Sequence, residues 1–118
     1  MLRSFFKCSV EKVTFPENGL KIIGNYMFKE SQIKEIDLTG VEEILSGAFM
    51  KCNNLQEANL LSCTTICDRA FQGCTALETV TIDAEKIKLG QYAFTDCTSL
   101  KSISINAAVI PAGAFNMC

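Results

Sequence analysis

The chain of 118 residues contains no histidine. Without this residue neither a Ser-His-Asp triad nor a Cys-His pair can form, which excludes the common nucleophilic hydrolases. A zinc site would have to use thiolates or carboxylates alone. No glycine-rich phosphate-binding loop of either usual form is present. We therefore expect a protein that is not an enzyme, with no catalytic residues, no metal and no cofactor.

Positive charge and long apolar stretches are also scarce. Eleven Lys and Arg stand against thirteen Asp and Glu, a net charge of −2, which leaves no electrostatic basis for binding nucleic acid or anionic lipid. The longest apolar stretch, from Ala107 to Ile110, is far shorter than the about 20 residues of a membrane-spanning helix. The N-terminus has no uninterrupted apolar region of the kind that a secretory signal requires. We expect no nucleic-acid partner and no membrane insertion.

The chain does contain one phrase that recurs. Residues 48–55 read Ala-Phe-Met-Lys-Cys-Asn-Asn-Leu, and residues 70–77 and 93–100 repeat the pattern Ala-Phe-x-x-Cys-x-x-Leu. Weaker copies lie at residues 4–8, 27–31 and 114–118. A period of 21 to 23 residues is typical of a solenoid, in which each coil completes the core of its neighbours. The recurring phenylalanines are Phe5, Phe28, Phe49, Phe71, Phe94 and Phe115.

Apolar residues between these phrases predict two extended segments in each unit. The first is an apolar triplet with spacings of three and two, whose last two positions have the period of a half-buried strand. The second is centred on one apolar residue five positions before the next phenylalanine. The Phe-x-x-Cys step is too short for a helix, so we interpret it as one helical or 3₁₀ turn. The triplets are Val10-Val13-Phe15, Ile33-Ile36-Leu38, Leu55-Ala58-Leu60, Leu77-Val80-Ile82 and Leu100-Ile103-Ile105, and the second positions are Ile23, Ile44, Ile66, Leu89 and Ile110.

The pattern resembles leucine-rich repeats, specifically the BspA-like class, whose units read roughly L-x-x-I-x-I…I-x-x-x-A-F-x-x-C-x-x-L. The resemblance implies an α/β solenoid that is mostly β: an open right-handed coil with a parallel β-sheet on one face and short helical turns on the other. Residues 1–118 would form a single domain of about five repeats without dedicated caps. Ser31, Met27 and Ala58 depart from the pattern. The first two repeats also lack one residue before the strand, a difference that we expect a short loop to absorb.

Five of the seven cysteines occupy the same position in the repeat, which predicts a packing role, since cysteine behaves in a core as a small apolar residue. Parallel side-chain directions on neighbouring coils disfavour disulfide geometry. Cys63 and Cys67 form an additional pair with no histidine beside them, and we interpret them as structural rather than as metal ligands. The five at the repeat position are Cys8, Cys52, Cys74, Cys97 and Cys118.

Polar residues alternate with the inward residues of the first strand and should point to solvent. The middle of this surface is acidic and its far end is rich in serine and threonine. Such a flat polar ladder is suited to contacting another protein, and the alternative is that it only keeps the sheet soluble. We call it the candidate sheet face: Lys12, Thr14, Lys34, Glu35, Asp37, Gln56, Glu57, Asn59, Glu78, Thr79, Thr81, Lys101, Ser102 and Ser104.

BspA-like proteins are typically surface or secreted proteins implicated in adhesion and recognition. The resemblance therefore implies a non-enzymatic module that binds another protein, at the cell surface or outside the cell, although the missing signal leaves a cytoplasmic address open. The alternative is structural. Neither end of the chain carries the polar capping unit of a solenoid, so the ends could stack and build a self-associating scaffold.

Overall fold

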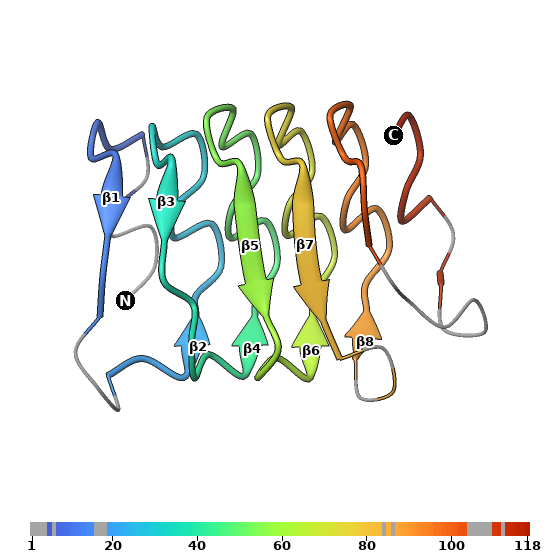
Figure 1. Ribbon diagram of the computed structural model, residues 1–118, viewed down its shortest axis with the longest axis horizontal. Coiled ribbons are helices and arrows are strands. Elements are labelled where there is room, and N and C mark those ends of the chain that lie inside the picture. The colour runs from blue at the N-terminus through green and yellow to red at the C-terminus, as the bar shows by residue number, and fades with distance from the viewer. Residues whose placement is uncertain are drawn as a thin grey trace.

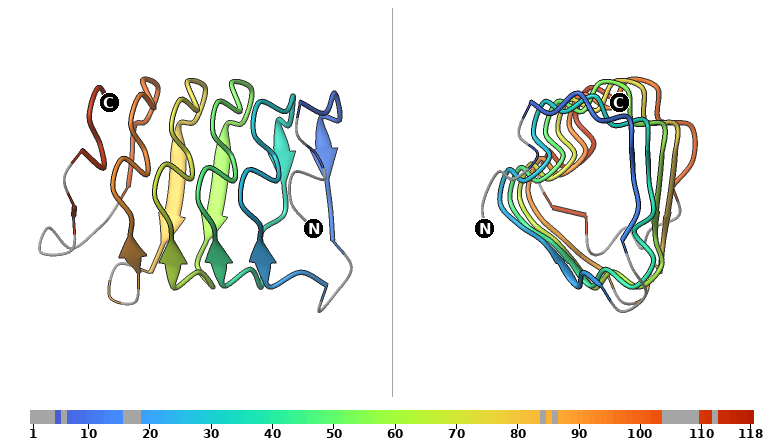
Figure 2. Two further views of the ribbon diagram at one scale, coloured as in Figure 1. Left: turned by 180° about the vertical axis from the view of Figure 1, so that it is seen from behind. Right: turned by 90° about the vertical axis from the view of Figure 1, so that its left-hand side faces the viewer.

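The computed structural model describes residues 5, 7–15, 19–83, 85, 87–103, 110–111 and 113–118. The chain winds into a solenoid of parallel strands whose coils stack along the long axis (Figure 1). Seen along that axis, the coils superpose on a three-sided outline (Figure 2). Two sides carry strands and the third is a column of turns. We number the coils by the phenylalanine that opens each: Phe5, Phe28, Phe49, Phe71 and Phe94 for coils 1 to 5.

The first side presents one strand from each of coils 1 to 4, all parallel. Its side chains alternate as predicted: β5 and β7 each read exposed, buried, exposed, buried. In coil 5, Ser102 continues the ladder through a bridge to Thr79. The strands are β1 (Lys12–Val13), β3 (Glu35–Ile36), β5 (Glu57–Leu60) and β7 (Thr79–Ile82).

The second side is a continuous four-stranded parallel sheet. It is formed by β2 (Ile22–Ile23), β4 (Glu43–Ile44), β6 (Thr65–Ile66) and β8 (Lys88–Leu89). The second residue of each strand is buried, which confirms the second extended segment that the sequence predicts. Ile110, the fifth such position, is 40% exposed and lies in no strand.

The third side contains turns where helical turns were predicted, and the described residues include no helix of any kind. The backbone is left-handed two residues before and two residues after the buried phenylalanine: Gly47 and Lys51, which flank Phe49, have φ values of 62° and 59°. Residues in this conformation cannot continue a right-handed helix. Glycine is needed at position 47, because an added Cβ there would lie 2.3 Å from the ring of Tyr26.

Hydrogen bonding on the third side alternates between two directions. The amides of Ala48, Met50 and Cys52 donate to carbonyls three residues back in the same turn column. The amides that alternate with these, namely those of Gly47, Phe49 and Lys51, donate to carbonyls about one repeat further along the chain. The acceptors are the carbonyls of Asp68, Ala70 and Gln72. A helix would keep every amide within its own segment, whereas here half of them join adjacent coils. This exchange satisfies the backbone of an otherwise irregular segment.

The core contains the predicted file of phenylalanines. Consecutive rings stack with centroids 4.8 to 5.5 Å apart and interplanar angles of 2° to 13°. The rings of coils 2 to 5 are fully buried. Two inward predictions differ in outcome. The prediction that Val10 points into the core is wrong, because this side chain is 39% exposed. Val10 lies in coil 1, which has a described neighbour on one side only. Ile105 lies outside the described residues.

Candidate partner-binding face

The candidate sheet face lies on the outer surface of the first side. Thirteen of its fourteen residues are described: twelve are exposed and Glu78 is half-buried, while Ser104 lies outside the described residues. The alternation of the strands produces this arrangement, because every residue between two inward ones must point outward. None of the five exposed large apolar side chains in the described chain belongs to this face. Its character is therefore polar, and its role in binding stays a prediction.

Ion pairs between neighbouring coils occupy every lysine of this face. Lys12 approaches Glu35 at 3.9 Å and Lys101 approaches Glu78 at 2.8 Å. Lys34 approaches Glu11 at 3.3 Å, so Glu11 also belongs to this surface although the candidate sheet face omits it. Exposed pairs of this kind add little stability, but they neutralise charge.

Two carboxylates of the face, those of Asp37 and Glu57, form no ion pair with any described residue. Asp37 instead accepts a hydrogen bond of 3.0 Å from the amide of Thr39. Hydrogen bonds from the hydroxyl and the amide of Thr39 lower the pKa of Asp37. One coil further on, Asn59 accepts the amide of Leu61 at 3.3 Å in the same local turn. Asp37 is thus a fixed negative charge at the end of β3.

Strand pairing on the first side stops between β3 and β5, which belong to separate two-stranded sheets. At the junction of coils 1 and 2, the carbonyl of Glu11 accepts the amides of residues 34 and 35 at 2.7 and 3.1 Å. At the junction of coils 3 and 4, the carbonyl of Gln56 accepts those of residues 78 and 79 at 2.9 and 3.4 Å. The equivalent carbonyl between coils 2 and 3 is that of Lys34. Among the described residues it accepts no backbone hydrogen bond from Gln56 or Glu57.

The break coincides with a change in loop length. Coils 1 and 2 have one residue between the cysteine position and the first inward position, whereas coils 3 to 5 have two, such as Asn53 and Asn54. Strands that follow loops of equal length pair, and strands that follow unequal loops do not. The expectation that a short loop would absorb this difference is therefore wrong for the sheet. The second side remains paired across the same junction, because β4 bonds to β6.

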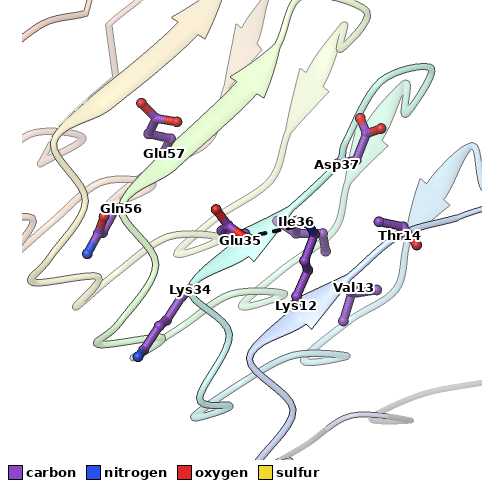
Figure 3. A pocket seen from close by; sticks show the side chains of 9 residues that line it. All are labelled: Lys12, Val13, Thr14, Lys34, Glu35, Ile36, Asp37, Gln56 and Glu57. Carbon is purple, nitrogen blue, oxygen red and sulfur yellow. Dashed lines mark ion pairs between the residues drawn. The ribbon is translucent and has the colours of Figure 1, made fainter.

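A slot of about 260 Å³ lies over β1 and β3 and extends to the start of β5 across this break (Figure 3). Seven of its nine lining residues belong to the candidate sheet face, and the other two, Val13 and Ile36, contribute apolar surface. Ile36 is partly exposed, whereas Ala58 and Val80, at the same position in coils 3 and 4, are buried. Sequence reasoning missed the slot. The signal that could have found it is the one-residue change in loop length.

The comparisons with known proteins agree with this architecture. The family model for the BspA type leucine rich repeat region matches residues 2–101, in six copies. This chain belongs to the BspA-type leucine-rich-repeat family. No curated protein and no solved structure matched it. The family accounts for the repeated phrase and for the stacked parallel coils, and leucine-rich repeats generally mediate protein interactions.

In this BspA-type solenoid the cysteines of the repeat take part in packing. The thiols of Cys52, Cys74 and Cys97 are fully buried, and each donates to the carbonyl of the phenylalanine one coil before, at 3.0 to 3.2 Å. All seven cysteines are free. Cys63 is buried and donates to the carbonyl of Thr65 at 3.3 Å. No group of three metal-ligating side chains occurs in the described part of the chain.

Burial also determines the acidity of these thiols. Burial raises the pKa of Cys52 and Cys63 to about 11 and that of Cys97 to about 12, against an ordinary value near 9. Protonated thiols of this kind are poor nucleophiles.

In the parts of the chain that the structure describes, no helix could cross a lipid bilayer.

Proposed function

We propose that this protein is a non-enzymatic module that binds another protein through the candidate sheet face. The observation that carries the proposal is a continuous exposed surface of polar residues, built by the family's own repeat and unobstructed by other parts of the described chain. Its side chains are regularly spaced because each comes from an equivalent position of a successive coil. A partner with complementary spacing and charge could therefore contact several coils at once.

The charge at the centre of the candidate sheet face indicates what kind of surface the partner has. Glu35 is paired with Lys12, whereas Asp37 and Glu57 carry charge that no described residue neutralises. Unpaired rim charges steer association and select among partners more than they add affinity. We therefore propose a partner whose contacting surface is basic where it meets coils 2 and 3.

The test is reversal of that charge. A partner is first isolated from the native cell with the immobilised protein, and its affinity is then measured with purified components by calorimetry. Replacing Glu35, Asp37 and Glu57 together by lysine should weaken binding by at least about tenfold, because like charges then meet across the interface. Unchanged affinity would show that the partner binds elsewhere.

A matched control makes the same change of charge on the second side. Glu42, Glu43 and Glu85 lie away from the candidate sheet face, on or beside the sheet formed by β2, β4, β6 and β8. Their replacement by lysine should leave the affinity within about twofold of the original, because screening limits the reach of exposed charges to about 10 Å. Equal weakening by both triple variants would indicate a general charge effect rather than a binding face.

The cellular role is proposed on family grounds alone. We propose adhesion or recognition at a cell surface, and microscopy of the full-length protein in its native cell tests the address. The alternative of a self-associating scaffold also stays a prediction. Sedimentation velocity over a wide concentration range distinguishes it, since a species that remains monomeric throughout would exclude the scaffold.

A further inference from the structure

We propose that the slot over β1, β3 and the start of β5 receives an arginine side chain of the partner, held by the carboxylates of Asp37 and Glu57 and by the carbonyl of Lys34. The inference depends on the proposed binding function and specifies its central contact. Three features of the slot support it: its shape, its charge and its unused backbone groups.

The slot can hold the apolar stem of a long side chain. It is open to solvent and has about 260 Å³ of space, and the partly exposed Ile36 of β3 is the apolar side chain that lines it most openly. The methylene groups of arginine can lie on such a surface while the charged head stays near polar groups. Ile36 is the natural contact, because the missing pairing with β5 leaves it partly exposed.

The charge of the slot favours a cation. Two lysines and three carboxylates line it. Lys12 is paired with Glu35 and Lys34 with Glu11, so neither lysine is available to neutralise the remaining two carboxylates. Those carboxylates come from the two strands that flank the break, since Asp37 follows β3 and Glu57 opens β5 (Figure 3).

The backbone distinguishes arginine from lysine. At the two flanking junctions a carbonyl in this position accepts two amides, but the carbonyl of Lys34 accepts neither amide of coil 3 in the described chain. It is therefore a backbone acceptor with unused capacity on the β3 side of the break. A guanidinium offers five donors in one plane and can reach several acceptors at once, whereas an ammonium is a compact point charge.

The experiment uses the intact protein and a defined probe. The ¹⁵N-labelled chain is titrated with N-acetyl-arginine amide, and amide chemical shifts are followed by NMR. We expect saturable shifts at Ile36, Gln56 and Glu57. The citrulline derivative, which keeps the shape but lacks the charge, should shift these amides about tenfold less. Equal shifts from both compounds, or shifts centred elsewhere, would overturn the proposal.

Variants locate the contact. The double variant Asp37→Asn/Glu57→Gln should abolish the saturable shifts, and asparagine keeps the side-chain oxygen that accepts the amide of Thr39. The control Glu43→Gln removes a carboxylate of β4, on the second side and outside the candidate sheet face, and should leave the titration unchanged. Thermal unfolding checks that each variant folds. A double variant that folds and still binds the probe would contradict the assignment.

The partner itself separates this inference from the proposed function. If the triple charge reversal prevents partner binding while the double neutral variant binds normally, the slot proposal is wrong and the sheet-face function stands. If the double neutral variant loses at least about tenfold in affinity and Glu43→Gln does not, the slot is the central contact.

Discussion

At the scale of single residues, cysteine at the repeat position fills space and donates a hydrogen bond. Cys74 is fully buried, and its thiol lies 3.1 Å from the carbonyl of Phe49. Alanine would supply neither the volume nor the donor. Ser31 occupies the same position in coil 2, and its hydroxyl lies 3.5 Å from the Sγ of Cys52. The thiols of Cys52, Cys74, Cys97 and Cys118 thus tie their segments to the phenylalanine carbonyl of the preceding coil, whereas Ser31 contacts the cysteine of the coil that follows.

The buried thiols should make the protein sensitive to alkali. Burial raises the pKa of Cys52 to about 11 and that of Cys97 to about 12, so the unfolded chain ionises first. The stability that they contribute is complete below pH 9 and is lost as the pH rises toward 11 and 12. We expect a loss on the order of 2 kcal/mol per thiol by pH 11, measured from urea unfolding at several pH values.

Cys97→Ala isolates the contribution of this one buried thiol. The variant should be less stable at neutral pH, but its further loss between pH 8 and pH 11 should be smaller than that of the original chain. Parallel losses in the two proteins would mean that the Cys97 thiol does not contribute to the pH dependence.

At the scale of the elements, pairing on the first side follows the length of the loop before each strand. Coils 1 and 2 share a short loop, coils 3 to 5 share a longer one, and the ladder of the first side breaks between the two groups. The column of turns tolerates the change, because its alternating hydrogen bonds continue from coil to coil. The break is therefore confined to one side of the solenoid.

Moving the change in loop length should move the break. Insertion of a second glutamine after Gln32 gives coil 2 the loop of coils 3 to 5 and leaves coil 1 alone with the short one. We expect the amide of Glu57 to gain protection from hydrogen exchange and that of Glu35 to lose it, because the pairing shifts by one coil. Amide exchange followed by NMR measures both.

A control insertion of one residue after Gly40, in the turn that precedes β4, should leave the protection of both amides as it is. Gly40 has open space around its α-carbon, so this turn can accept an added residue without a clash. If the original insertion leaves Glu57 unprotected, loop length is not the cause of the break.

The sequence predicts the parts of this fold that every coil repeats. The phenylalanine file, the buried strand positions and the outward polar ladder all follow from a fixed period, because identical positions in stacked coils must meet. The turns of the third side also recur from coil to coil, yet the prediction of their conformation was wrong. The turns of the third side could not be recognised as non-helical, since Lys51 and Asp96 adopt left-handed backbone without being glycine. The slot was missed because it depends on a difference between coils.

At the scale of the molecule, the solenoid is a one-dimensional stack in which position decides the cost of a substitution. Phe71 is fully buried between two rings at 5.0 and 5.2 Å. Phe115 is partly buried and has one stacked neighbour, at 5.5 Å. A cavity within the stack should therefore weaken two interfaces, and a change at Phe115 should weaken one.

Phe71→Ala should cost about 3–5 kcal/mol, because the cavity left between two occupied coils cannot collapse fully. That is a large share of the about 5–15 kcal/mol that stabilises a typical domain, so we expect substantial unfolding. Phe115→Ala should cost clearly less. Denaturant unfolding followed by circular dichroism compares the two, and equal losses would contradict a stack in which only neighbours interact.

The alternating hydrogen bonds of the third side make the coils interchangeable parts. The turn amides of each coil donate to carbonyls of the next coil, and its own carbonyls accept the equivalent amides of the coil before. A tandem duplication of residues 71–93 would therefore meet matching donors and acceptors on both sides. In-frame copying of one such segment could thus lengthen the gene product without any compensating mutation. A duplication that spans coils 2 and 3 would instead create three junctions between loops of unequal length, and the ladder of the first side would be interrupted at each of them.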